Sequence, residues 1–208
     1  MARYTGSVCK LCRREGTKLF LKGDRCLSGK CAIEKHPSVP GQHGNGRKNV
    51  KEYGVQFREK QKAKRYYGVP EKQFANYFRI ATKKEGQAGE NLLILLERRL
   101  DNVVYRMGMA ESRREARQLV RHGHFTLNGH RADIPSILCS ANDVVALKDK
   151  SKASEKFKAI LSNIDNKLFP KWLEVDKENL SARLNALPQR SDVDFEFTES
   201  LIVELYSK

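Results

Sequence analysis

Four of the chain's five cysteines lie near its start, as the pairs Cys9-x2-Cys12 and Cys26-x4-Cys31, with thirteen residues between the pairs. A gap of two residues lets both sulfurs of a pair face one ion, and a second pair on a loop of this length completes a tetrahedral shell of thiolates. Such a shell is closed, so we expect a structural metal centre that holds residues 1–45 folded. Zn²⁺ is the default ion, and four thiolates also suit an iron–sulfur cluster.

Two disulfides, or four unconnected thiols, remain as alternatives for these cysteines. The chain begins with polar residues rather than an apolar signal sequence, which favours a reducing compartment and disfavours disulfides. Basic residues inside the segment would offset the charge of about −2 of a thiolate-bound divalent ion; they are Lys10, Arg13, Arg14, Lys18, Lys22, Arg25 and Lys30. The fifth cysteine, Cys139, follows two apolar residues and is expected to be a small core side chain.

The charge of the chain is strongly positive and unevenly distributed. The net charge is +15, and residues 1–50 carry 11 Lys and Arg against 3 Asp and Glu, whereas residues 151–208 carry 9 against 10. An excess of this size calls for a polyanion, so we expect nucleic acid as the partner of the first half of the chain. The longest apolar run, Leu92 to Leu96, is too short to span a bilayer. The sequence contains no G-x-x-x-x-G-K loop of the kind that binds nucleotide phosphates, so we expect no small-molecule substrate.

The periodicity of apolar residues predicts an α+β fold. Helices are expected over 50–67 and 70–81, and from about 90 to 107 with a break near Glu97. Residues 112–115, Ser-Arg-Arg-Glu, form a capping box that opens a helix to 122, in which the Glu115 carboxylate should reach back to the Ser112 amide.

Short strands are expected after this helix. Asn128-Gly129 favours positive φ at both positions and predicts a tight hairpin between strands at 125–127 and 130–134. A further strand is expected at 143–147 and a helix around 157–164, and residues 201–206 suit either a strand or a helix.

The helix from Ser112 places three arginines at i, i+3 and i+7, Arg114, Arg117 and Arg121, opposite an apolar face. We expect them to form one exposed stripe whose guanidinium groups bind successive RNA phosphates. Arg113, Asn128 and Arg131 would extend this surface. Further candidates for RNA contact are basic residues of the first half: Arg13, Arg14, Arg47, Lys48, Lys51, Arg58, Lys60, Lys62, Lys64 and Arg65.

Several long motifs carry a resemblance to a known family. They are GENLL at 89–93, LERRLDNVVYRMG at 96–108, EARQLV at 115–120, PGQHG at 40–44, REKQK at 58–62 and LIVELYSK at 201–208. Through them the chain resembles bacterial-type small-subunit ribosomal protein four from end to end, and its four cysteines match the four-cysteine branch of that family.

The resemblance implies both architecture and role. It implies a helical domain over 46–97 completed by 161–208, with an RNA-binding module of two helices and a β-sheet inserted at 98–160. It further implies a cytoplasmic, ribosomal protein that binds the 5′ domain of 16S ribosomal RNA early in assembly and takes part in translational accuracy. It would lie beside ribosomal proteins three and five, where messenger RNA enters, with Arg47, Lys48 and Lys51 as candidates to touch messenger. Some members also repress their own operon, which the sequence leaves open.

Two other classes of protein carry the same small module. Residues 99–101, Arg-Leu-Asp, resemble the nucleophile motif of pseudouridine synthases, but Asp101 falls in a heptad-like helical stretch and no second domain of catalytic size remains, so we expect no enzyme. A free four-cysteine regulator would instead bind DNA sequence-specifically and would not associate with ribosomes.

Overall fold

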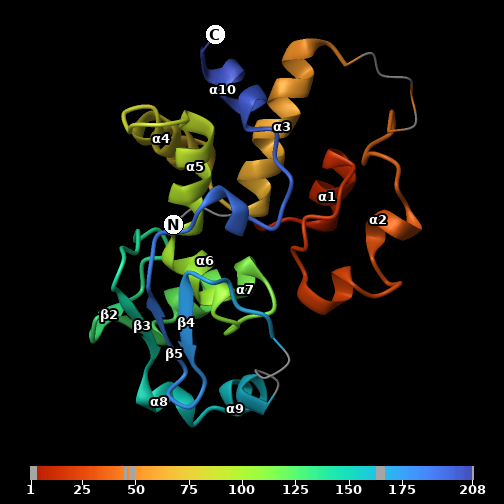
Figure 1. Ribbon diagram of the computed structural model, residues 1–208. Coiled ribbons are helices and arrows are strands. Elements are labelled where there is room, and N and C mark those ends of the chain that lie inside the picture. Colours follow the sequence, from red (N-terminus) through yellow and green to blue (C-terminus); the bar gives the residue numbers. More distant parts are fainter. Residues whose placement is uncertain (1–3, 45, 47–49, 163–166, 208) are drawn as a thin grey trace. The chain divides into compact units, whose positions relative to one another are not determined.

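The computed structural model describes residues 4–44, 46, 50–162 and 167–207, and it has the expected α+β fold (Figure 1). The chain divides into two compact units, Met1–Leu92 with Phe195–Lys208, and Leu93–Asp194. In the described part of the chain, no helix has the length and apolarity needed to cross a membrane.

The first unit begins with the cysteine segment. It contains α1 (Cys9–Glu15), the 3₁₀ helix η1 (Gly23–Cys26) and α2 (Ala32–Lys35). Only a few apolar side chains, such as Leu19 and Leu21, are buried here together with three of the cysteines. A segment with so small an apolar core depends on another source of stability.

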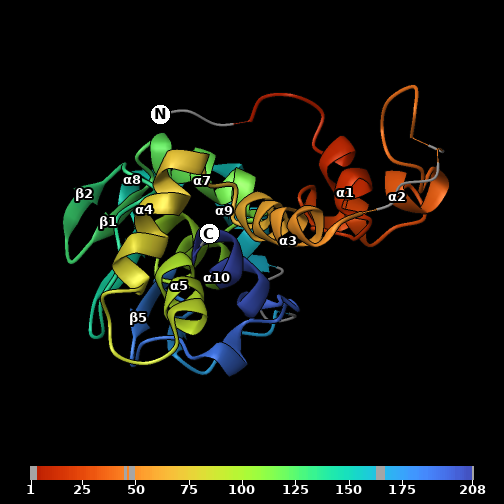
Figure 2. The ribbon, with the colours of Figure 1, turned by 90° about the horizontal axis from the view of Figure 1, so that it is seen from above.

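The rest of the first unit is helical, with α3 (Glu52–Tyr66), α4 (Glu71–Ala81), α5 (Ala88–Glu97), which runs on into the second unit, and α10 (Glu199–Ser207). The two expected helices over 50–67 and 70–81 are confirmed, and the C-terminal segment is a helix. Packing explains this choice, because α10 lies along α3 and Tyr206 stacks on Phe78 with ring centroids 4.5 Å apart (Figure 1). From above, α1 is seen beside α3 (Figure 2).

The second unit packs helices on an antiparallel sheet. Its helices are α6 (Leu100–Arg106), α7 (Arg113–Arg121), α8 (Asp149–Lys152) and α9 (Glu155–Ser162), with a 3₁₀ turn η3 (Arg190–Asp192). The sheet has the order β2-β1-β3-β5-β4, from β1 (Phe125–Leu127), β2 (His130–Ala132), β3 (Val144–Leu147), β4 (Leu173–Asp176) and β5 (Ser181–Leu184). Buried side chains of α6, α7, α9 and the strands form one core, for which Val104, Val120, Phe125, Val145 and Phe157 are representative.

Two local predictions are confirmed in this unit. Asn128 and Gly129 have φ of 50° and 80°, as a two-residue hairpin turn requires. The helix break falls between Glu97 and Leu100, because Arg99 is extended and pairs with Leu138 as an isolated β-bridge.

The expected extent of the inserted module differs from what the structure shows. Residues 161–208 were expected to complete the helical domain, but within them only Phe195–Lys208 belong to the first unit. The reason is the unpredicted strand pair β4 and β5. Strand β5 pairs with β3, with Ala182 opposite Val145, and β4 pairs with β5; Leu173 of β4 and Leu184 of β5 are buried in the core of the second unit.

Candidate nucleic-acid interface

Helix α7, the centre of the expected RNA surface, begins at a cap that is half of the predicted box. The Glu115 amide donates to Ser112 Oγ over 3.3 Å, as expected. The Glu115 carboxylate, however, accepts from the amide of Glu111 over 2.8 Å. The cap at Ser112 therefore fixes the start of α7. The hydrogen bond to the Glu115 carboxylate comes from the amide of Glu111, one residue before the Ser112 amide that was predicted.

The prediction that three arginines of α7 share one exposed stripe is wrong for Arg117, which is only 8% exposed. Its Nη1 donates to Asp101 Oδ2 over 3.0 Å. The same carboxylate accepts from Nε and Nη2 of the fully buried Arg99, over 3.1 and 3.0 Å. Arg117 therefore joins α7 to α6 through an ion pair, which is the physical reason that it does not face solvent.

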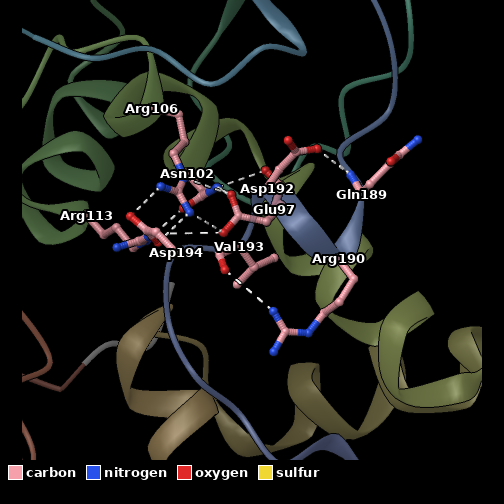
Figure 3. A network of polar contacts seen from close by, with 9 residues as sticks. All are labelled: Glu97, Asn102, Arg106, Arg113, Gln189, Arg190, Asp192, Val193 and Asp194. Atoms are coloured by element: carbon pink, nitrogen blue, oxygen red, sulfur yellow. Dashed lines mark hydrogen bonds and ion pairs between the residues drawn. The ribbon is translucent and has the colours of Figure 1, made fainter.

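A second buried polar network surrounds Glu97 (Figure 3). Arg106 Nη2 and Asn102 Nδ2 donate to the two oxygens of Glu97 over 2.9 and 2.6 Å. Arg106 also forms a double hydrogen bond to Asp194, over 2.8 and 2.9 Å. Burial works against its charge, but Glu97 and Asp194 together raise the pKa of Arg106. This network ties α6 to the end of the second unit.

Arg113 belongs to this network and is buried, contrary to its expected place at the border of an exposed stripe. Its Nε donates to Asn102 Oδ1 over 2.7 Å, and its guanidinium carbon lies 4.4 Å from the centre of the Tyr105 ring. The sequence does contain a sign of a buried polar network, because charged residues occupy core-facing positions within 96–108. Spacing alone, however, does not reveal which partners these residues have.

The expected surface retains Arg121, which is exposed, Arg114, which is half-buried, and Arg131, whose side chain is 67% exposed. Asn128 is exposed, but its side-chain amide already makes two hydrogen bonds. Its Nδ2 donates to Asp143 over 2.9 Å, and its Oδ1 accepts from the Val144 amide over 2.8 Å. Its observed role is to join the hairpin to β3.

The basic residues of α3 lie against the protein's own carboxylates. Glu71 accepts from Lys60 and Lys64 over 2.5 and 2.8 Å, and Glu59 accepts from Lys62 over 2.7 Å. Each of these lysines is mostly covered, so part of the positive charge of α3 is neutralised within the unit. Their contact with RNA stays a prediction.

Glu15 of α1 makes the corresponding contact to Arg58 and Arg65, and its side chain is only 1% exposed. Burial raises the pKa of Glu15, against the lowering effect of Arg65 and Arg58. This carboxylate attaches the cysteine segment to α3.

The remaining candidates are distributed along the first unit. Arg14 and Lys51 are exposed, whereas Arg13 is half-buried and its Nε donates to the Ser38 carbonyl over 2.9 Å. Arg47 and Lys48 lie outside the described residues.

The four cysteines of the N-terminal segment are free thiols, and three of them, Cys12, Cys26 and Cys31, are buried. Burial raises the pKa of the Cys12 thiol, a hydrogen bond from the Leu19 backbone lowers it, and the charges of the other three sulfurs raise it further. The Lys22 amide lies 3.4 Å from Cys26 Sγ as a hydrogen-bond donor. Cys139 is fully buried in the other unit, as expected for a core residue.

Comparison with known proteins gives the class. Residues 3–97 match the family described as Ribosomal protein S4/S9 N-terminal domain, and residues 98–145 match the S4 domain. The second match covers α6, α7, the hairpin and the first half of β3. The chain is thus a ribosomal-type protein with an S4 domain.

Full-length relatives give the particular family. The chain is 61% identical to the small ribosomal subunit protein uS4 of Acetivibrio thermocellus and 60% identical to that of Clostridioides difficile. It is 62% identical to uS4A of Alkaliphilus oremlandii, and each comparison spans 208 residues and 100% of both chains. The chain belongs to the uS4 family of small ribosomal subunit proteins.

Proposed function

We propose that this protein is a structural constituent of the small subunit of the cytoplasmic ribosome and binds ribosomal RNA. The observation that carries the proposal is the full-length identity of about 60% to uS4 proteins, together with both family matches. The net charge of +15 supports a polyanionic partner.

An RNA-modifying enzyme is the disfavoured alternative. Asp101, the residue at the position of a synthase nucleophile, is 3% exposed and accepts hydrogen bonds from Arg99 and Arg117. A carboxylate enclosed in this way stabilises the fold and is out of reach of a nucleotide. The relatives are named as ribosomal proteins, in agreement with a role outside catalysis.

The finer proposal is that the protein binds the 5′ domain of 16S RNA early and nucleates assembly of the subunit. In the second unit Arg121 and Arg131 are its best placed phosphate ligands, because they are exposed, whereas Arg113 and Arg117 are buried against structural partners. We further propose that it lies near incoming messenger RNA, next to ribosomal proteins three and five, and contributes to translational accuracy, with Lys51 as a candidate for messenger contact.

We also propose that the four cysteines hold a structural metal ion, Zn²⁺ or the iron of a cluster, which would make this chain a four-cysteine member of the family. The burial of three thiols, the effect of the other three sulfurs on the pKa of Cys12, and the backbone amides directed at Cys12 and Cys26 support it. Within the described residues, no three His, Cys, Asp or Glu side chains are already gathered as a metal-binding group, so an ion would draw the thiols together.

The test of RNA binding is the affinity of the full chain for 5′-domain RNA, measured at several salt concentrations against another 16S domain of equal length. Arg121→Ala and Arg131→Ala should each reduce the slope of log K against log salt by about 1, because each removes about one phosphate contact. Arg183→Ala, at another exposed arginine, on β5, is the matched control. Equal affinity for both RNAs, with unchanged slopes, would refute the proposal.

A further inference from the structure

A group of basic side chains gathers where α7 ends. Gly123 ends the helix with φ of +74°, and the Arg131 guanidinium from β2 lies over it, so that a Cβ at this position would be 3.3 Å from both Nε and Nη2. The neighbouring Arg121 and His122 are exposed. The close approach possible at a glycine thus brings a cation of the hairpin to the last turn of α7.

His124 extends this group towards β3 and α8. Its ring centre is 6.1 Å from that of His122, its Nδ1 is 3.0 Å from Ser151 Oγ, and its carbonyl accepts from the Lys148 amide over 2.9 Å. The ring forms a T-shaped pair with that of Phe157 of α9, with centroids 5.4 Å apart. With Nδ1 directed to Ser151, the other ring nitrogen, Nε2, is the one that can serve a ligand.

The charged groups that act on His124 are cations: His122, Lys148 and Lys156. The carboxylates of this region already have partners, since Glu115 pairs with Lys156, Asp149 with Lys152 and Asp133 with Arg131. His124 therefore stands among positively charged groups, and an incoming anion would relieve their repulsion.

We propose that Arg121, His122, His124, Arg131 and Lys148, here called the histidine site, bind the phosphodiester backbone of RNA, and that the imidazole of His124 makes this contact stronger as the pH falls. The inference rests on the proposed RNA-binding function and adds to it a titratable phosphate site.

The sign of the effect follows from the surroundings of His124. Burial lowers the pKa of this imidazole, and His122, Lys148 and Lys156 lower it further, so the free protein holds it mostly neutral near pH 7. A bound phosphate offsets those positive charges and favours the imidazolium form, so that binding takes up protons. Each proton taken up strengthens binding by at most about tenfold per unit of pH.

The test is the affinity of the full chain for 5′-domain RNA at constant ionic strength, from about pH 8 down to about pH 5.5, the range over which histidine titrates. The wild type should bind several-fold more tightly at the acidic end, and the His122→Gln/His124→Gln variant should lose most of this gain. His130→Gln, at an exposed histidine of the hairpin turn, is the matched control and should keep it. Comparison of variants on one RNA removes the effect of protonation of the RNA bases.

Calorimetry in two buffers of different ionisation enthalpy gives a second readout, the number of protons taken up on binding. His124→Gln alone serves if the double variant proves unstable. A pH slope and proton uptake equal to wild type in these variants would overturn the histidine site while leaving RNA binding intact. Failure of the wild type to bind this RNA at any pH would instead overturn the proposed function.

Discussion

Arg117 and Arg121 are four residues apart on one helix, yet they have different surroundings. Arg117 is paired with a buried Asp101, whereas Arg121 is exposed. The helical spacing places both arginines on one side of α7, but the carboxylate that pairs with Arg117 belongs to α6. A partner contributed by another element leaves no trace in the local pattern, which is why single ion pairs are the part of the site that sequence predicts worst.

Substitution at these two positions should separate stability from binding. Arg117→Ala removes a hydrogen bond between charged groups and should lower the free energy of unfolding by about 2–3 kcal/mol. Arg121→Ala should change it by less than about 0.5 kcal/mol, as is usual at the surface, while weakening RNA binding. Urea unfolding of both variants checks this, and equal losses of stability would contradict the assignment of Arg117 to the fold.

At the scale of elements, the hairpin illustrates a local signal that suffices. The positive φ of Asn128 and Gly129 and the cap at Ser112 depend on neighbouring residues alone, so the sequence predicts them. By contrast, the sequence does not predict β4 and β5, because each alternates apolar and polar residues over only four positions, and the pairing of β5 with β3 links residues about forty positions apart.

The Asn128 side chain joins the hairpin to β3, which gives a prediction for this element. Asn128→Ala loses the hydrogen bonds to Asp143 and Val144 and places a less suitable residue at φ of 50°, so stability should fall by about 1–3 kcal/mol. Asn128→Gly keeps the turn geometry and loses only the hydrogen bonds. Thermal unfolding should therefore give the highest midpoint for the wild type, a lower one for the glycine variant and the lowest for the alanine variant. An alanine variant as stable as the wild type would show that the Asn128 side chain does not stabilise the hairpin.

At the scale of the molecule, the cysteine segment and the S4 domain belong to different units, so they should respond independently to loss of the proposed metal. Cys26→Ser, or a chelator, should increase protease cleavage within residues 4–44, because the segment has little apolar core to replace the ion. The S4 domain should stay resistant.

Limited proteolysis with mass spectrometry locates the cuts, and Cys139→Ser, at a cysteine of the other unit, shows the effect of losing a buried thiol elsewhere. An N-terminal segment that stays protected in Cys26→Ser would exclude a metal-dependent fold.

Membership of the small ribosomal subunit can be tested by sedimentation of a cell lysate through a sucrose gradient at moderate and high salt, with the protein detected in each fraction. We predict that it migrates with the small subunit and with assembled ribosomes at both salt concentrations. Migration at the top of the gradient, or release at moderate salt, would rule out a stable place in the small subunit and indicate a free RNA-binding protein.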